Sequence, residues 1–155
     1  MILVTVGTQL PFPRLIKALD DMAPRLGRVV AQIGDNPEVP KNIEHHRSME
    51  PRAFEQLFLA ADRIVAHAGI GTLLAAKKHG KPIIIFPRRA AMGEHRNDHQ
   101  LATAKQLESQ VGVFVAYDEA ELERLLFLPS LAPATNAPSP SLRGLQGAIR
   151  DFIAG

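Results

Sequence analysis

The chain has 155 residues, 46% of them hydrophobic and 22% charged, with a formal net charge of +2, and such values are typical of one globular domain. It contains no cysteine, which excludes disulfides, thiolate metal ligands and cysteine nucleophiles. One tyrosine and no tryptophan argue against a stacking surface for single-stranded nucleic acid, so we expect no nucleic-acid partner.

Apolar and amphipathic segments alternate along the chain. Short continuous apolar runs are typical of strands buried on both faces of a parallel sheet, and the amphipathic stretches between them indicate helices. This alternation predicts an α/β fold, a Rossmann-like parallel sheet with helices on both faces. The predicted strands are residues 2–6, 28–33, 43–47, 63–66, 83–86 and 113–115, and the predicted helices are residues 13–22, 51–61, 72–79, 97–108 and 118–126.

The C-terminal part of the chain differs in composition. Residues 129–140 are rich in Pro, Ala and Ser, which predicts a tether, and a helical pattern resumes in residues 141–155. We therefore expect a compact domain in residues 1–128, followed by the tether and a C-terminal helix. That helix either packs on its own domain or docks on a partner protein, and both alternatives fit the pattern.

The N-terminal segment MILVTVGT lacks the basic region and the cleavage site of a signal peptide. No apolar stretch reaches the roughly 18 residues that a membrane span needs. The sequence therefore predicts a soluble cytoplasmic protein, and any attachment to a membrane is expected to pass through a partner.

Two loops with glycine follow predicted strands, at the sheet edge where α/β proteins bind ligands. In HAGIGT the glycines bare the backbone beside a helix start, whose free N–H groups and partial positive charge favour an anion. A plain turn capped by a threonine fits this motif equally well, and a buried, hydrogen-bonded histidine is the simpler explanation of its first residue. A plain turn also explains the first loop. The candidate residues in the two loops are Gly7, Thr8, His67, Gly69, Gly71 and Thr72.

A third loop, PRRAAMGEHRNDHQ, concentrates polar side chains after the most apolar strand. Its amide, carboxylate and imidazole groups offer directed donors and acceptors of the kind that bind hydroxyl-rich ligands such as sugars. A metal site at His95 and His99 is the alternative, but the sequence supplies no obvious third ligand, and no metal is expected. The candidates in this loop are Arg88, Glu94, Asn97, Asp98, His99 and Gln100.

Together these motifs resemble the C-terminal half of family 28 glycosyltransferases. The resemblance rests on VGTQLPFPRLI, RIVAHAGIGTLLAAKKHGKPIIIFPR and GEHRNDHQLATA, and it covers residues 1–127. The resemblance is stronger to relatives that consist of this half alone. These relatives are the catalytic subunit of the UDP-GlcNAc transferase that acts on dolichol-linked sugar, and bacterial exopolysaccharide subunits of the PssE and EpsE type. The resemblance implies the C-terminal half of a GT-B fold that binds a UDP-sugar.

The resemblance also implies roles for the three loops. The donor pyrophosphate is expected near the Gly7 loop and the helix after Gly71, and Arg88 or Arg89 would add positive charge for the pyrophosphate or for an acidic sugar. His99 and Gln100 fall where the family holds donor-sugar hydroxyls. One position departs from the family pattern: the acidic residue that binds the ribose is replaced by Ala75. The residues predicted to bind the donor are Gly7, Thr8, His67, Gly69, Gly71, Thr72, Arg88, Glu94, Asn97, Asp98, His99 and Gln100.

The activity that the resemblance implies is inverting transfer of GlcNAc, glucuronate or glucose from a UDP-sugar to a lipid-pyrophosphate-linked acceptor. The start of the helix would stabilise the leaving UDP, without a metal or a cofactor. The general base of full-length relatives lies on a half that this sequence does not match, so no catalytic residue is assigned here. A membrane-anchored partner subunit is expected to supply the acceptor site and to hold the chain at the inner face of the membrane. The alternative is a non-catalytic module that binds nucleotide-sugar or stabilises its partner.

Overall fold

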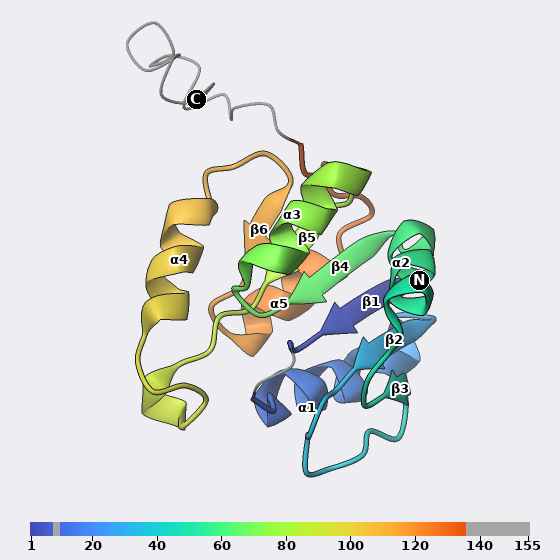
Figure 1. The fold of residues 1–155 in the computed structure, drawn as a ribbon, viewed down its shortest axis with the longest axis vertical. Helices are drawn as coiled ribbons and strands as arrows, with labels where there is room; N and C mark the ends of the chain where they lie inside the picture. The colour runs from blue at the N-terminus through green and yellow to red at the C-terminus, as the bar shows by residue number, and fades with distance from the viewer. Residues whose placement is uncertain (8–9, 136–155) are drawn as a thin grey trace, which may run out of the picture.

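The computed structural model describes residues 1–7 and 10–135. In these residues a parallel sheet of six strands lies between two layers of helices (Figure 1). Short 3-10 helices, Ala23–Arg25 and Ala90–Met92, follow the first helix and the fifth strand. The strands are β1 (Ile2–Thr5), β2 (Val29–Gln32), β3 (Glu44–His46), β4 (Arg63–Ala66), β5 (Ile83–Ile85) and β6 (Val113–Val115), and the helices are α1 (Pro13–Met22), α2 (Pro51–Ala60), α3 (Ile70–His79), α4 (His99–Leu107) and α5 (Glu119–Leu126).

The sheet has the strand order β3-β2-β1-β4-β5-β6, and every pair of neighbours is parallel. The chain therefore runs outward from β1 in one direction, returns, and then runs outward from β4 in the other. The predicted α/β class with a parallel sheet is confirmed. In such sheets the crevice at the carboxyl ends of the two strands where the order reverses is the usual ligand site. Here those strands are β1 and β4.

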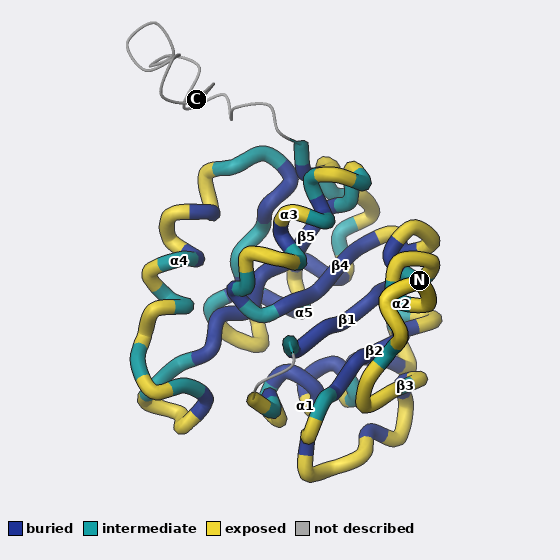
Figure 2. The backbone as a smooth tube through the Cα atoms, in the orientation of Figure 1, coloured by how far each residue is buried: buried dark blue, intermediate teal, exposed yellow. Residues whose placement is uncertain are grey.

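Strand side chains contribute to two separate hydrophobic cores because successive residues point to opposite faces of the sheet. Val4 and Ile84 pack with α1 and α5 on one face, while Leu3 and Ile83 pack with α2, α3 and α4 on the other. The central strands are consequently buried on both faces, whereas the helices keep an exposed outer side (Figure 2). This double burial accounts for the nearly unbroken apolar runs in the sequence.

Local sequence signals set the ends of most helices. Pro13 and Pro51 occupy first helical positions, where a missing N–H costs nothing. The Asp118 side chain, at the N-cap of α5, accepts a hydrogen bond from the Glu121 N–H at 2.8 Å, which is the usual contact of an aspartate at that position. Gly80 ends α3 in the left-handed conformation, with φ of 64°, which glycine adopts without strain.

Two helices begin two residues away from their predicted starts. Helix α3 starts at Ile70 rather than at residue 72, with Gly69 as its N-cap, so Gly71 lies inside the first turn. Helix α4 starts at His99 rather than at residue 97. The Asp98 Oδ1 accepts the Ala90 N–H at 2.9 Å, and this contact holds the segment before α4 in a loop.

The predicted tether is in part packed against the domain. Leu131 contacts one core, and Ala134 is fully buried and donates its N–H to the Lys81 carbonyl oxygen at 3.1 Å. A Cβ on Gly112 would overlap the backbone of Pro133 and Ala134. The packed domain thus continues beyond residue 128, and the predicted C-terminal helix of residues 141–155 lies outside the described residues.

Candidate functional site

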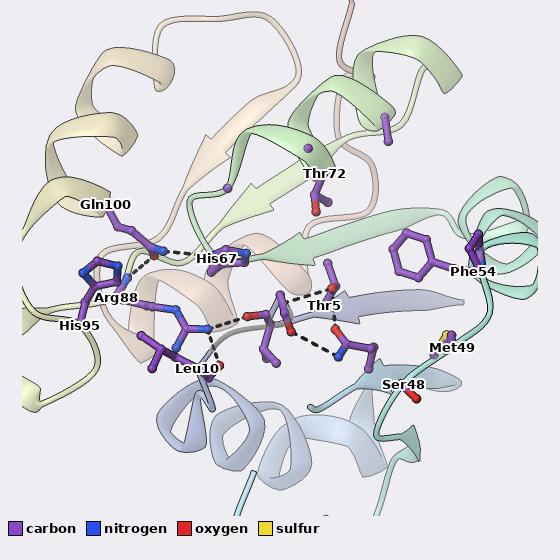
Figure 3. Close-up of a pocket in the computed structure, with 17 residues that line it drawn as sticks. Thr5, Leu10, Ser48, Met49, Phe54, His67, Thr72, Arg88, His95 and Gln100 are labelled. Carbon is purple, nitrogen blue, oxygen red and sulfur yellow. Dashed lines mark hydrogen bonds between the residues drawn. The ribbon is translucent and has the colours of Figure 1, made fainter. Parts of the chain in front are cut away.

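A cavity of about 560 Å³ opens at the carboxyl ends of β1 and β4, where the strand order reverses (Figure 3). This volume is typical of sites for small molecules and cofactors. Helix α3 forms one wall and the start of α2 forms another. The lining residues are Thr5, Val6, Gly7, Leu10, Gln32, Ser48, Met49, Pro51, Phe54, His67, Gly69, Gly71, Thr72, Ala75, Arg88, His95 and Gln100.

The His67 imidazole lies between two of the predicted glycines. A Cβ on Gly7 would lie 2.7 Å from the His67 Nε2, and a Cβ on Gly69 would lie 2.8 Å from its Cε1. Both distances are shorter than real carbon contacts allow. Gly7 also has a φ of 81°, which side chains rarely tolerate. These two glycines therefore make room for the imidazole, in addition to baring the backbone.

The two alanine substitutions at the glycines of HAGIGT are expected to have opposite effects. Gly69→Ala should lower the free energy of unfolding by about 1–3 kcal/mol, because the new methyl group overpacks the site. Gly71→Ala should be neutral or stabilising by up to about 1 kcal/mol, since a Cβ there meets nothing within 4 Å. Urea unfolding of the two variants beside the wild type measures the difference. Equal effects would show that the His67 ring does not occupy this place.

The first turn of α3 is open to an anion. Its N-cap, Gly69, has no side chain that could accept a hydrogen bond from the turn, so the first backbone N–H groups point outward without a cap. Gly71, within that turn, also leaves open space around its Cα. Unpaired N–H groups and the helix dipole together favour a negatively charged group at this place.

The Gln100 side chain joins three parts of the site. Its Oε1 accepts the backbone N–H of Arg88 at 2.9 Å and that of Ala68 at 3.3 Å. Its Nε2 lies 2.9 Å from the His67 Nδ1. The amide therefore connects the loop after β5 to the loop after β4 and braces the imidazole from behind.

Burial lowers the pKa of His67 from 6.5 to about 4, and the positive charges of Arg88 and His95 act in the same direction. At neutral pH the imidazole is consequently uncharged. A neutral imidazole carries one N–H donor and one acceptor nitrogen. His67 is thus a buried, hydrogen-bonded histidine that also lines the cavity. The two interpretations that the sequence offers for this residue are therefore compatible.

Acidification from about pH 6.5 to pH 4 is expected to remove up to about 3 kcal/mol of folding stability through His67, at about 1.4 kcal/mol for each pH unit. Below pH 6.5 the unfolded chain binds a proton at this side chain while the folded chain does not, so the contribution is complete above pH 6.5 and is lost as the pH falls. Chemical denaturation at both pH values measures it. The His67→Asn variant keeps a hydrogen-bond acceptor for Gln100 but has no titrating group at this position. The same acidification should therefore remove correspondingly less of its folding stability. Equal losses would contradict the buried, neutral imidazole.

Arg88 is only 2% exposed, and its guanidinium binds the β1–α1 loop. The Nη2 donates to the Val6 and Leu10 carbonyl oxygens at 2.5 and 2.8 Å, and the Nη1 donates to the Pro11 carbonyl oxygen at 2.6 Å. The group also lies over the Phe12 ring, 4.5 Å from its centroid. Arg88 lines the cavity as predicted, but these contacts commit its donors to the protein backbone rather than to a ligand.

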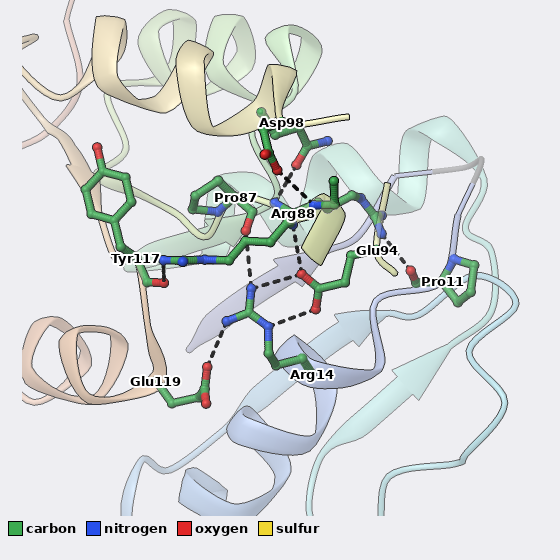
Figure 4. Close-up of polar contacts among 11 residues, drawn as sticks. Pro11, Arg14, Pro87, Arg88, Glu94, Asp98, Tyr117 and Glu119 are labelled. Carbon is green, nitrogen blue, oxygen red and sulfur yellow. Dashed lines mark hydrogen bonds and ion pairs between the residues drawn. The ribbon is translucent and has the colours of Figure 1, made fainter. Parts of the chain in front are cut away.

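Glu94 lies outside the main cavity, in a bracing network around Arg14 (Figure 4). Its carboxylate accepts hydrogen bonds from the Arg14 Nε and Nη2 at 2.8 and 3.0 Å and from the Arg89 N–H at 3.0 Å. Burial alone would lower the pKa of Arg14, but its bonds to Glu94 and Glu119 raise it above the ordinary value. Glu94 thus holds the loop after β5 against α1, which is a structural task.

Three more predicted residues also lie outside the main cavity. The Asn97 Oδ1 accepts the His99 N–H at 3.0 Å, and Asp98 binds Ala90 as described above. His99 opens α4, so His95 lies before that helix and the two imidazoles are not one helical turn apart on α4. A role of these side chains in donor binding stays a prediction. Thr8 lies outside the described residues.

Several cavity residues were missed by sequence reasoning. Thr5 and Gln32 are paired in the parallel register, and the Thr5 hydroxyl donates to the Gln32 Oε1 at 2.9 Å. A polar residue that ends an otherwise apolar strand is the signal that could have found both. Two loops that the sequence already singles out contribute Val6, Leu10 and His95. Nothing in the local pattern marks the rest, since only the chain path through the start of α2 brings them to the cavity. The missed residues are Thr5, Val6, Leu10, Gln32, Ser48, Met49, Pro51, Phe54 and His95.

Residues 1–7 and 10–135 hold no group of three or more His, Cys, Asp or Glu side chains that could bind a metal ion. In the same residues no helix is both long enough and apolar enough to cross a membrane.

The fold and the cavity define a Rossmann-like α/β domain with a helix start that lacks a side-chain cap at the switch point of its sheet. The chain belongs to glycosyltransferase family 28, because the sequence profile of the family's C-terminal domain matches residues 1–127. The family predicted from the three loops is thereby confirmed.

Two related proteins illustrate the similarity. The human UDP-N-acetylglucosamine transferase subunit ALG13 is 29% identical in an alignment of 94 residues that covers 56% of this chain and 8% of that protein. A solution structure that bears the name ALG13 has a TM-score of 0.60 and 18% identity and covers 93% of this chain and 93% of its own. SsfS6 of Streptomyces sp. SF2575, complexed with thymidine diphosphate, has a TM-score of 0.56 and 25% identity over 83% of this chain and 33% of its own. The chain thus spans a small part of human ALG13 and about a third of SsfS6.

Proposed function

We propose that this chain is the donor-binding, catalytic subunit of an inverting glycosyltransferase. It takes a sugar from a UDP-sugar and passes it to a lipid-pyrophosphate-linked acceptor presented by a membrane-associated partner subunit. The observation that carries the proposal is the open first turn of α3 beside the neutral His67, in a cavity at the switch point of the sheet. A diphosphate is the ligand group that best suits such a place.

The donor is proposed to lie along α3. The diphosphate faces the N–H groups of the first turn, the nucleoside extends past Ala75 toward Phe54, and the sugar points toward His95. Phe54 and Met49 offer apolar contact to a base, and both line the cavity. Ala75 cannot bind the ribose hydroxyls as the usual acid does, so Thr72, whose hydroxyl points from α3 into the cavity (Figure 3), is the proposed substitute.

The chemical contribution of the chain is electrostatic. When the glycosidic bond to UDP breaks, negative charge builds on the diphosphate, and backbone N–H groups already aimed at that place stabilise it. No side chain of this chain is proposed as general base. The partner subunit is proposed to supply both the base and the acceptor, and the name of ALG13 as a transferase subunit supports such a division of labour.

A non-catalytic binding module is the second candidate, and Ala75 at the ribose position is the observation that favours it. Such a module would bind UDP weakly or not at all and would stabilise its partner without transferring sugar. Transfer assays with the partner subunit present distinguish a catalytic subunit from a binding module. With a catalytic subunit, UDP is released in proportion to the glycosylated product, whereas a non-catalytic module transfers no sugar.

The test of the proposed function is a calorimetric titration with UDP, UDP-GlcNAc, UDP-glucuronate and UDP-glucose, followed by transfer to a lipid-pyrophosphate acceptor with the partner present. We expect all four nucleotides to compete for one site and one UDP-sugar to be turned over. AMP serves as the control nucleotide, since it lacks the diphosphate. Absence of binding by every uridine nucleotide would refute the proposal.

A further inference from the structure

The orientation of the Gln100 amide is determined by its surroundings. Two backbone N–H groups, of Arg88 and Ala68, point at one end of the amide, at 2.9 and 3.3 Å. That end must be the oxygen, because an NH₂ group there would face two other donors. The NH₂ end consequently lies at the His67 Nδ1, 2.9 Å away.

This orientation decides which nitrogen of His67 carries the proton. The Gln100 NH₂ can only donate, so the Nδ1 must accept and the proton of the neutral ring sits on the Nε2. The Nε2 lies beside Gly7 on the floor of the cavity, where a Cβ on that glycine would be 2.7 Å from it. It has no hydrogen-bond partner among the described residues, and it is not one of their fully buried unpaired atoms. The N–H is therefore available to a ligand.

We propose that Gln100 is a positioning residue that locks His67 in its Nε2–H form, so that the ring offers one uncharged N–H donor to the diphosphate of the donor nucleotide. This inference rests on the proposed function. It assigns Gln100 a task different from the sugar-hydroxyl contact that the sequence predicts. Three of the four hydrogen-bonding positions of the amide are already used by Arg88, Ala68 and His67.

The Nε2–H form of His67 is important because the other protonation forms of the imidazole are less favourable for binding a diphosphate. An Nδ1–H form would turn the lone pair of the Nε2 toward negatively charged oxygens. A doubly protonated ring would attract them, but burial and the nearby charges of Arg88 and His95 disfavour it. Gln100 thus selects the one neutral form that donates into the cavity.

The direct test is a long-range ¹H–¹⁵N spectrum of the histidine rings, recorded on the full chain labelled with ¹⁵N-histidine, with His67 assigned through its backbone. We expect the His67 Nε2 to be protonated and the Nδ1 to be bare at neutral pH. Addition of UDP should shift the Nε2 signal and leave the Nδ1 unprotonated. A proton on the Nδ1 of the wild type would overturn the proposal, and this outcome requires no variant.

Gln100→Glu tests the role of the amide. A carboxylate still accepts from Arg88 and Ala68 but cannot donate, so His67 should take a proton on its Nδ1 and its pKa should rise in the NMR titration. UDP affinity at neutral pH should fall at least about tenfold, which corresponds to 1.4 kcal/mol. Gln106→Glu, an exposed position on the same helix α4, adds the same charge and should change neither quantity.

The outcomes separate this inference from the proposed function. If the ring spectrum shows the Nε2–H form but the wild-type protein does not bind UDP, the proposed function is wrong. In that case a diphosphate is not the group that accepts the His67 N–H either. If UDP binds but Gln100→Glu has the ring spectrum and the UDP affinity of Gln106→Glu, Gln100 does not position His67. Thermal unfolding of both variants verifies that each is folded.

Discussion

Gly71→Asp is expected to weaken UDP binding by at least about 100-fold, since a carboxylate about 4 Å from a phosphate charge costs on the order of 4 kcal/mol at an effective dielectric constant of 20. The new side chain meets nothing within 4 Å of its Cβ and lies in the first turn of α3. A negative charge there stabilises the helix, so the domain should stay folded. Calorimetric titration of UDP against variant and wild type measures the loss.

Gly71→Asn is the matched control, because it has the same shape without the charge. We expect its UDP affinity to lie within about tenfold of the wild type, a difference of about 1.4 kcal/mol. Raising the salt concentration should narrow the difference between the Asp and Asn variants, because salt screens exposed charges. Equal UDP affinity of the Asp variant and the wild type would exclude the start of α3 as the diphosphate site.

Arg88→Met is expected to lower the free energy of unfolding by about 1–3 kcal/mol, because a buried carbonyl left without its donor costs about that much. The guanidinium donates to the buried carbonyl of Val6 and to the partly exposed carbonyls of Leu10 and Pro11. Methionine fills a similar volume but donates nothing, so the β1–α1 loop loses its anchor. Urea unfolding, followed by circular dichroism, measures the stability.

Two further variants show whether the loss comes from the hydrogen bonds. Arg88→Lys keeps the charge with a shorter reach and should fall between the wild type and Arg88→Met. Arg96→Met removes an exposed arginine of the same loop and should change stability by less than about 0.5 kcal/mol. If Arg88→Met were as stable as Arg96→Met, the guanidinium would not anchor the loop.

Much of the fold could be predicted because its signals are local. Strand β4 and helix α1 have the predicted bounds, since each begins and ends at residues whose chemistry marks the ends. The starts of α3 and α4 could not be placed, because they depend on what their first residues contact. The His67 ring leaves no room for a side chain at Gly69, the N-cap of α3, and Asp98 is held by Ala90 across the loop.

The candidate site was predictable in its glycines and histidine but only in part in its polar loop, of which Arg88 and Gln100 line the cavity. His67 and Gly71 directly follow β4, so their sequence position places them at the ligand edge of the sheet. Glu94 and Asp98 are equally polar, yet they bind Arg14 and backbone groups of their own loop. A charged side chain in a loop after a strand satisfies a protein partner as readily as a ligand, and composition alone does not distinguish the two.

The sequence by itself determined the parallel α/β class, the family and the loops that carry the site, because apolar runs, helix caps and glycine motifs act over a few residues. The tertiary structure alone decided that Arg88 points inward to anchor the β1–α1 loop, and that Gln100 reaches His67. Those contacts join residues 82 and 33 positions apart. Only the strand order, which places β1 and β5 on either side of β4, brings such distant side chains within hydrogen-bonding distance.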